Sequence, residues 1–466
     1  METHFAYISL TIVAVLFTGI YFQIMQLTST VNYVRQNFKN NNRFDLREVQ
    51  LKMMNQQQIL AIEARDHLYS STLIEDPSVV TNKAVLFTNK SVLDFNCQAL
   101  INGDNNEMSR YIKGFENHKI NKTLDVKTRF SNITANCTHF VTHRGYITDA
   151  LTKEEKQFPI AFSILIHEEV KQVETLLRAI YRPQNLYCIH VDRKSTAAFY
   201  EEILAISSCF DNVFLTSQRF DVKWGTMSVL EPEIECMKDL WNKRVSWKYF
   251  INLTGQEFPL RTNFELVKIL RAYNGANDIS ATLRLANKER WSNAGPAPHN
   301  IRPSKGAVHI AASRGYVDYL LHDQRAKDLL EWTRKTDVPD ETFFSTLNSN
   351  SHLNVPGSYN GNYLANPIHT YTSSLTRYKQ WRFAGHEDLC KGKFVRNICI
   401  LGVGDLPVLA KSEMLFANKF FLDFQPLALE CMEELVYNRT RDEYLGSIHF
   451  NDTLYTQQDF VINQIR

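Results

Sequence analysis

The sequence lacks the short motifs that mark several large enzyme classes. Gly402-Val-Gly404 is not completed to G-x-G-x-x-G, and neither G-x-x-x-x-G-K-[ST] nor G-x-S-x-G occurs. These absences argue against a dinucleotide site, a P-loop and a serine-hydrolase elbow. His167-Glu168 is followed by Lys171, where the zinc-protease motif H-E-x-x-H requires histidine.

The sequence also lacks an excess of charge of either sign. It has 52 Lys and Arg against 50 Asp and Glu in 466 residues, a formal net charge of +2. This balance argues against a nucleic-acid-binding protein and against a disordered charged scaffold. With 44% hydrophobic and 12% aromatic residues, the chain can bury a large core.

Motifs that hold a metal ion are missing as well. There is no C-x-x-C and no D-x-D, the pair with which many nucleotide-sugar enzymes hold a divalent cation on a diphosphate. The segment HVDRK (190–194) offers one aspartate followed by basic residues. A diphosphate bound here would need cationic side chains in place of a metal.

Residues 5–25 form the first apolar run and contain no charged residue. About 20 apolar residues span a bilayer as a helix, and the run exceeds the apolar core of a cleaved signal peptide. We expect a cytosolic tail at 1–4, an uncleaved transmembrane signal-anchor at 5–25 and a polar stem at 26–90. Arg35 and Lys39 follow the run, which alone would favour a cytosolic main body.

Glycosylation sequons and cysteines outweigh that bias and favour the secretory lumen. Sequons predict N-glycosylation at Asn89, Asn121, Asn132, Asn136, Asn438 and Asn451. Asn252 also lies in a sequon, but within an apolar run where glycosylation is not expected. The eight cysteines are even in number, as in an oxidising compartment, and their spacing leaves about 105 pairings open.

After residue 158, strand-like and helix-like segments alternate. Apolar runs at 158–166, 185–191, 212–217 and 247–253 predict buried strands, and the segments 170–180, 195–209 and 226–241 predict helices, the last interrupted by its proline. This alternation predicts an α/β fold with a mostly parallel sheet. Ligands bind beyond the carboxyl ends of such strands, which points to His167 and Asp192.

Five ordered blocks carry a family resemblance that runs from about residue 97 to about residue 431. They are FPIAFSILIHEEVKQVETLLRAIYRPQNLYCIHVD, WKYFINLTGQEFPLRTN, VPDETFFSTL, FVRNICILGVGDL and MLFANKFFLDFQPLALEC. The chain resembles the core 2/I-branching β-1,6-N-acetylglucosaminyltransferase family, which also contains the peptide O-xylosyltransferases. The resemblance implies a GT-A catalytic domain, here at 91–444, a UDP-sugar donor, no metal cofactor and a type II Golgi membrane protein. It leaves the C-terminal tail, 445–466, unexplained.

By this resemblance Glu341, in VPDE, is the catalytic base. The reaction needs such a group, because an acceptor hydroxyl must lose its proton as it attacks the anomeric carbon of the donor. The alternative is that Pro339-Asp340-Glu341 only opens a helix, where carboxylates favour the positive end of the dipole. We expect Asp340 to cap that helix.

The resemblance also implies residues for the donor and the acceptor. Arg396 and Lys419 would hold the diphosphate and offset the charge on the leaving UDP. The nucleotide pocket would be lined by Leu165, Ile166, His167, Asp192, Arg193, Lys194 and Trp224. On the acceptor side, Trp381 and Phe383 would stack on a sugar ring. Ser280 stands where the branching enzymes have a glutamate that contacts acceptor hydroxyls, so the acceptor is left open.

The resemblance further pairs the cysteines as Cys97–Cys431, Cys137–Cys209, Cys188–Cys236 and Cys390–Cys399.

The function it implies is inverting, metal-independent transfer of a β-1,6-linked sugar, GlcNAc from UDP-GlcNAc, to core 1 O-glycans of glycoproteins. The alternatives are a related transferase with UDP-glucose, UDP-xylose or another acceptor, and a catalytically silent lumenal glycan-binding protein. The expected partners are the UDP-sugar, the O-glycan and a Golgi membrane, but no nucleic acid.

Overall fold

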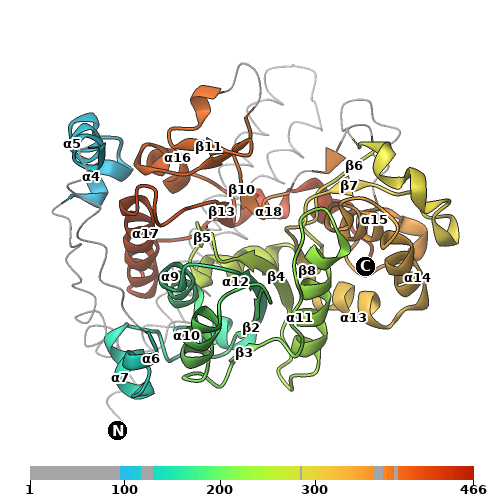
Figure 1. Cartoon of the computed structure of the whole chain (residues 1–466), viewed down its shortest axis with the longest axis horizontal. Helices are drawn as coiled ribbons and strands as arrows, with labels where there is room; N and C mark the ends of the chain where they lie inside the picture. Colours follow the sequence, from blue (N-terminus) through green and yellow to red (C-terminus); the bar gives the residue numbers. More distant parts are fainter. Residues whose placement is uncertain (1–94, 117–129, 284–285, 361–370, 373, 383–386) are drawn as a thin grey trace, which may run out of the picture. The chain divides into compact units, whose positions relative to one another are not determined.

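The computed structural model describes residues 95–116, 130–283, 286–360, 371–372, 374–382 and 387–466 (Figure 1). All of these belong to the unit formed by residues 72–466. The predicted anchor (5–25) and stem (26–90), together with Asn89, Asn121 and Phe383, lie outside the described residues. Within the described ranges, none of the helices combines the length and the apolar character that a membrane crossing needs.

A five-stranded sheet forms the centre of the described chain, in the order β3-β2-β1-β4-β8. Its strands are β1 (Ile160–Ile166), β2 (Leu186–Val191), β3 (Val213–Leu215), β4 (Tyr249–Thr254) and β8 (Ala311–Ser313). The first four run parallel, and β8 pairs antiparallel with β4. The predicted mixed α/β fold with a mostly parallel sheet is confirmed. The strand order reverses between β1 and β4, the position where open α/β sheets bind ligands.

Helices cover both faces of this sheet, which explains why its strands are apolar almost throughout (Figure 1). Alternate residues of β1, such as Phe162 and Ile164, join the core beneath α9 (Val170–Ile180), α10 (Ala197–Ser207) and α12 (Asn263–Ala272). Ala161 faces the other core, beneath α11 (Glu231–Trp241), α13 (Arg314–His322) and α14 (Gln324–Thr333). The predicted helix at 226–241 is a 3₁₀ turn followed by α11, because Pro232 fits only the first helical turn.

Smaller elements surround the main sheet. The short strands form a sheet of β10 (Arg377–Tyr378), β13 (Phe416–Asn418) and β5 (Glu257–Pro259), a hairpin of β11 (Lys393–Val395) and β12 (Ile398–Ile400), and a sheet of β7 (Lys305–Gly306), β6 (Ala281–Thr282) and β9 (Tyr371–Thr372). The remaining α-helices are α4 (Cys97–Ile101), α5 (Asn105–Glu116), α6 (Phe130–Ile133), α7 (Cys137–His143), α8 (Lys153–Gln157), α15 (Phe343–Ser349), α16 (Leu406–Ala410), α17 (Leu427–Tyr444), α18 (Thr453–Thr456) and α19 (Asp459–Ile462). The 3₁₀ turns are η2 (Met227–Val229), η3 (Lys288–Ala294), η4 (Pro298–Asn300), η5 (Pro339–Glu341), η6 (Ser351–Leu353), η7 (Glu387–Leu389) and η8 (Val403–Asp405).

The cysteines are paired as the resemblance implies. Cys97–Cys431 joins α4 to α17 across 334 residues of sequence, and Cys188–Cys236 joins β2 to α11. Cys390–Cys399 ties the segment before β11 to β12. The fourth bridge, Cys137–Cys209, attaches α7 to the end of α10.

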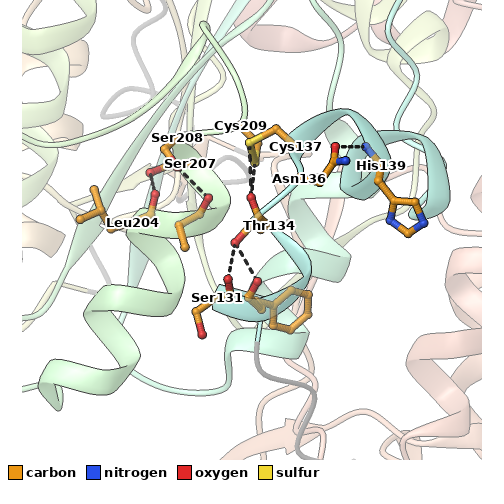
Figure 2. Close-up of a disulfide and its surroundings, with 11 residues drawn as sticks. Ser131, Thr134, Asn136, Cys137, His139, Leu204, Ser207, Ser208 and Cys209 are labelled. Carbon is orange, nitrogen blue, oxygen red and sulfur yellow. Dashed lines mark hydrogen bonds between the residues drawn. A yellow bond between two sulfur atoms is a disulfide. The ribbon is translucent and has the colours of Figure 1, made fainter.

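Figure 2 shows how Cys137–Cys209 is embedded. The carbonyl oxygen of Thr134 lies 3.6 Å from Sγ of Cys137 and 3.8 Å from Sγ of Cys209. Asn136 is exposed, and its side-chain oxygen caps α7 by accepting a hydrogen bond of 3.0 Å from the backbone N–H of His139. The sequon at Asn136 therefore lies on the surface, at a helix start that the disulfide holds in place.

The segment 445–466 packs against the main core through α18 and α19. Tyr455 and Phe460 are buried, and the Phe460 ring meets Tyr273 edge-on with the ring centroids 5.0 Å apart. Backbone hydrogen bonds join residues 357–358 to Ile465, and the Tyr359 hydroxyl donates to Asp459 at 2.6 Å. The tail that the resemblance leaves unexplained is thus an integral part of the folded unit.

Replacing Phe460 with Ala should lower the free energy of unfolding by about 3–5 kcal/mol, because the change leaves a cavity against Tyr273. Chemical denaturation monitored by circular dichroism measures this loss. The matched control is Ile462→Ala in the same helix, whose side chain is 67% exposed and should change stability by less than about 0.5 kcal/mol. Equal losses for the two variants would contradict the packing of the tail.

Candidate active site

The carboxyl ends of β1, β2 and β4 meet at one edge of the main sheet. Leu165 and Ile166 end β1, and the carbonyl of Ile166 accepts a hydrogen bond of 2.9 Å from the N–H of Asp192, just after β2. The Ser195 hydroxyl donates to the carbonyl of His167 at 2.9 Å. The structure therefore brings together His167 and Asp192, as expected for adjacent parallel strands.

The predicted nucleotide-lining residues Arg193 and Lys194 lie against the segment 219–224. The backbone N–H of Arg193 donates to the carbonyl of Phe220 at 2.9 Å. The Lys194 ammonium contacts carboxylate oxygens of Asp192 and Asp221, each at 3.1 Å, and the Val222 carbonyl. Trp224, at the end of this segment, is 82% exposed, so its indole is open to a ligand.

The loop that carries Glu341 is fixed by contacts with two other segments. The N–H of Val338 donates to the carbonyl of Gly225 at 3.0 Å, and the N–H of Asp337 donates to the carbonyl of Arg290 at 2.9 Å. Val338 has a φ of 50°, an unfavourable value for a β-branched residue that only a well-determined surrounding structure maintains. The turn η5 follows and ends at Glu341.

Two cations contact the Glu341 carboxylate. Nη1 of Arg290, in η3, lies 2.5 Å from Oε2, and Nζ of Lys305, in β7, lies 3.4 Å from the same oxygen. Glu341 remains partly exposed, with 29% of its side-chain surface accessible. The carboxylate is therefore held from two sides and still open to a ligand.

The prediction that Asp340 caps the following helix is wrong. Helix α15 begins after Thr342, which makes no side-chain capping bond. Asp340 is buried, and Oδ1 has no hydrogen-bond partner among the described residues. Burial and the neighbouring Glu341 charge raise the pKa of Asp340 to about 6. The intervening 3₁₀ turn moves this carboxylate away from the first free N–H groups of α15.

Arg396 occupies the tip of the β11–β12 hairpin. Arg396 and Asn397 both have positive φ, 49° and 65°, as a two-residue hairpin loop requires. Lys419 directly follows β13, and its carbonyl accepts a hydrogen bond of 2.9 Å from the N–H of Leu401. Burial and the Arg396 charge lower the pKa of Lys419. The hairpin thus brings the two predicted diphosphate-binding cations into electrostatic range of each other.

Near Lys419 lies Glu257, which no sequence pattern had pointed to. Its carboxylate is fully buried and accepts from Nε of Arg377 at 3.0 Å, from Asn418 at 2.8 Å and from the N–H of Thr254 at 3.1 Å. Nε2 of His309 lies 2.9 Å from Oε1, the oxygen that also accepts from Asn418. Burial acts to raise the pKa of Glu257, but Arg377 and His309 outweigh burial and hold it well below its ordinary value.

Lys379 and His309 are two further residues of this region that were not predicted from the sequence. Nζ of Lys379 lies 3.2 Å from Nδ1 of His309. Burial and the nearby Lys379 charge lower the pKa of His309 to about 4, so the ring is neutral at pH 7 and accepts from the lysine while donating to Glu257. The position of Lys379, two residues before Trp381, is the signal in the sequence that could have identified it.

The two predicted acceptor residues that the structure describes lie in different places, Ser280 beside the segment that carries Lys305 and Trp381 beside β12. The Ser280 hydroxyl accepts from the N–H of Ala307 at 3.2 Å, next to Lys305. Glycine at position 306 permits this approach, because a Cβ there would lie 2.3 Å from the carbonyl oxygen of Ser280. Trp381 pairs with Ile398 and leaves 42% of its surface exposed. In the part of the chain that the structure describes, no three His, Cys, Asp or Glu side chains are grouped to hold a metal ion.

Comparison with known proteins identifies relatives of this chain. The human β-1,3-galactosyl-O-glycosyl-glycoprotein β-1,6-N-acetylglucosaminyltransferase is 35% identical over 369 residues, which cover 73% of this chain and 84% of the relative. The mouse N-acetyllactosaminide β-1,6-N-acetylglucosaminyl-transferase is 38% identical over 327 residues, which cover 66% of this chain and 80% of the relative.

The family model of the Core-2/I-Branching enzymes matches residues 160–410, more than half of the chain. The matched segment includes β1, the Glu341 loop and the hairpin that carries Arg396. The chain therefore belongs to the Core-2/I-Branching enzyme family and is a glycosyltransferase.

Proposed function

We propose that this protein transfers GlcNAc from UDP-GlcNAc in a β-1,6 linkage to core 1 O-glycans, with inversion and without a metal ion. The transferred sugar and the linkage are those named for its relatives, which are β-1,6-N-acetylglucosaminyltransferases. The core 1 acceptor follows from relatives named for acting on β-1,3-galactosyl-O-glycosyl-glycoproteins. The observation that carries the proposal is the partly exposed Glu341 carboxylate, held by Arg290 and Lys305.

Glu341 has the geometry of a general base. Among the described contacts, both cations approach Oε2, which leaves Oε1 to accept a proton from the acceptor hydroxyl. As that hydroxyl oxygen forms a bond to C1 of GlcNAc, the bond between C1 and the β-phosphate oxygen breaks. The electron pair leaves with UDP, and attack from the opposite face converts the α-linked donor into a β-linked product.

Arg396 and Lys419 supply the positive charge for this leaving group. The two cations lie close enough for the charge of Arg396 to lower the pKa of Lys419, after burial the largest influence on that amine. Binding of a diphosphate would relieve the repulsion between them. Fixed cations that face a developing negative charge contribute several kcal/mol to transition-state stabilisation, the task of a divalent ion in other enzymes.

The proposed location is the Golgi lumen, with the residues 5–25 as a single membrane anchor. Two features support an oxidising lumenal compartment. The four disulfides use all eight cysteines of the chain. Of the predicted glycosylation sites that the structure describes, Asn132, Asn136 and Asn451 are exposed, and Asn438 is half-buried.

Glu341→Gln should lower kcat for GlcNAc transfer by about 10²- to 10⁴-fold, because an amide cannot take the acceptor proton. Transfer from labelled UDP-GlcNAc to a core 1 disaccharide measures the loss, and calorimetry with UDP should show that the variant still binds nucleotide. Glu201→Gln, at an exposed position of α10, is the matched control and should behave as the wild type. A Glu341→Gln enzyme with wild-type kcat would exclude the proposed base.

Replacing Arg396 or Lys419 with Met should lower kcat by about 10²- to 10³-fold, as each variant loses one charge facing the leaving group. Lys411→Met, at an exposed position after α16, is the control and should keep wild-type activity. Assays in excess EDTA should give the wild-type rate. Loss of activity in EDTA with recovery on addition of Mn²⁺ would contradict metal-independent transfer.

A further inference from the structure

The positive charge around Glu341 exceeds what this carboxylate neutralises. Arg290 and Lys305 both contact Glu341, and the Arg290 contact uses one of the five N–H groups of its guanidinium. Lys379 has no carboxylate partner in the described part of the chain, where its nearest polar contact is His309. These three cations come from η3, β7 and the segment after β10, so the fold assembles them from distant parts of the sequence.

Nearby acidic groups do not cancel this excess. Glu257 is already paired with Arg377, and His309 is neutral at pH 7 because burial and Lys379 lower its pKa to about 4. Burial and Arg377 lower the pKa of Lys379 to about 8, so the amine is still mostly protonated at pH 7. Among the described residues, the carboxylates that face these three cations and are not already paired elsewhere are Glu341 and the buried Asp340, which leaves one positive charge without a counter-charge.

Lys379 shares a face with the exposed aromatic Trp381. The N–H of Arg382 donates to the carbonyl of Asn397 at 2.8 Å, and the N–H of Cys399 donates to the carbonyl of Gln380 at 2.9 Å, so this segment is extended beside β12. Side chains two residues apart on an extended segment point to the same side. The Trp381 ring, which is suited to a sugar ring, and the Lys379 ammonium, which has two N–H donors besides the one directed at His309, therefore extend from the same side of this segment.

We propose that Arg290, Lys305 and Lys379 form a subsite for an anionic substituent, a carboxylate or a sulfate ester, on the acceptor glycan. This inference rests on the proposed function, in that the acceptor sugar lies between Glu341 and Trp381. Charge-assisted hydrogen bonds from two or three of these cations would hold the anion. Removal of the acceptor proton by Glu341 reduces the negative charge in the group, and a bound anion would restore it.

The test compares acceptors that differ only in charge, with the full-length chain in detergent. The acceptors are a neutral core 1 disaccharide, its 3-O-sulfated form, its sialylated form and the methyl ester of the latter. The wild type should show a kcat/KM at least about tenfold higher for one charged acceptor than for the neutral disaccharide. The methyl ester should fall to the neutral level. Preference for the sulfated or the sialylated acceptor would identify the anion.

Lys379→Met should reduce this preference to about twofold or less, mainly through KM, and Lys379→Arg should retain most of it. Lys327→Met, at an exposed position in α14, is the matched control and should leave the preference intact. Thermal denaturation checks that each variant is folded. A wild-type enzyme that uses the neutral disaccharide as well as every charged form would overturn the subsite and leave the proposed function standing.

Calorimetry of the same acceptors in the presence of UDP separates the two hypotheses. If no acceptor receives GlcNAc, the proposed function fails. Tighter binding of a charged glycan, lost in Lys379→Met, would still support the subsite. Equal binding of neutral and charged glycans would refute it.

Discussion

One buried carboxylate, Glu257, connects the segments that carry the candidate site. Its carboxylate accepts hydrogen bonds from Arg377 in β10, from Asn418 in β13 and from the N–H of Thr254 at the end of β4. It also contacts His309, in the segment after β7. A fully buried charge is costly unless each of its oxygens is satisfied. Lys379 and Lys419 each lie within electrostatic reach of this carboxylate. The two lysines thus share one anionic support.

The elements of the main sheet could be predicted from the sequence because each carries its own signal. The runs at 158–166 and 247–253 are apolar since both faces of β1 and β4 are covered by helices. The helical spacing at 170–180 matches α9, and Pro232 marks the start of α11. The disulfide pairs could not come from such local signals; they followed from the family resemblance and agree with the structure.

The remaining features depend on contacts between distant residues, which local patterns do not encode. Lys379 and His309 are 70 residues apart, and only the folded chain brings them into contact. Asp340 was expected to cap a helix, but its local sequence does not reveal the 3₁₀ turn that separates it from α15. The apolar residues of the last segment likewise show no clear period, and only the folded chain places Phe460 against Tyr273. Roles for Glu341, Arg396 and Lys419 came from the resemblance, while their surroundings came from the fold.

The bridge between Cys97 and Cys431 also bears on how the protein withstands proteolysis. It closes a covalent ring that contains the whole main sheet, the Glu341 loop and the Arg396 hairpin. A single cut by a protease anywhere inside this ring leaves the two fragments linked. Their local concentration then stays high, so the pieces remain assembled by their packed cores. A nicked molecule would migrate as one species until the disulfide is reduced.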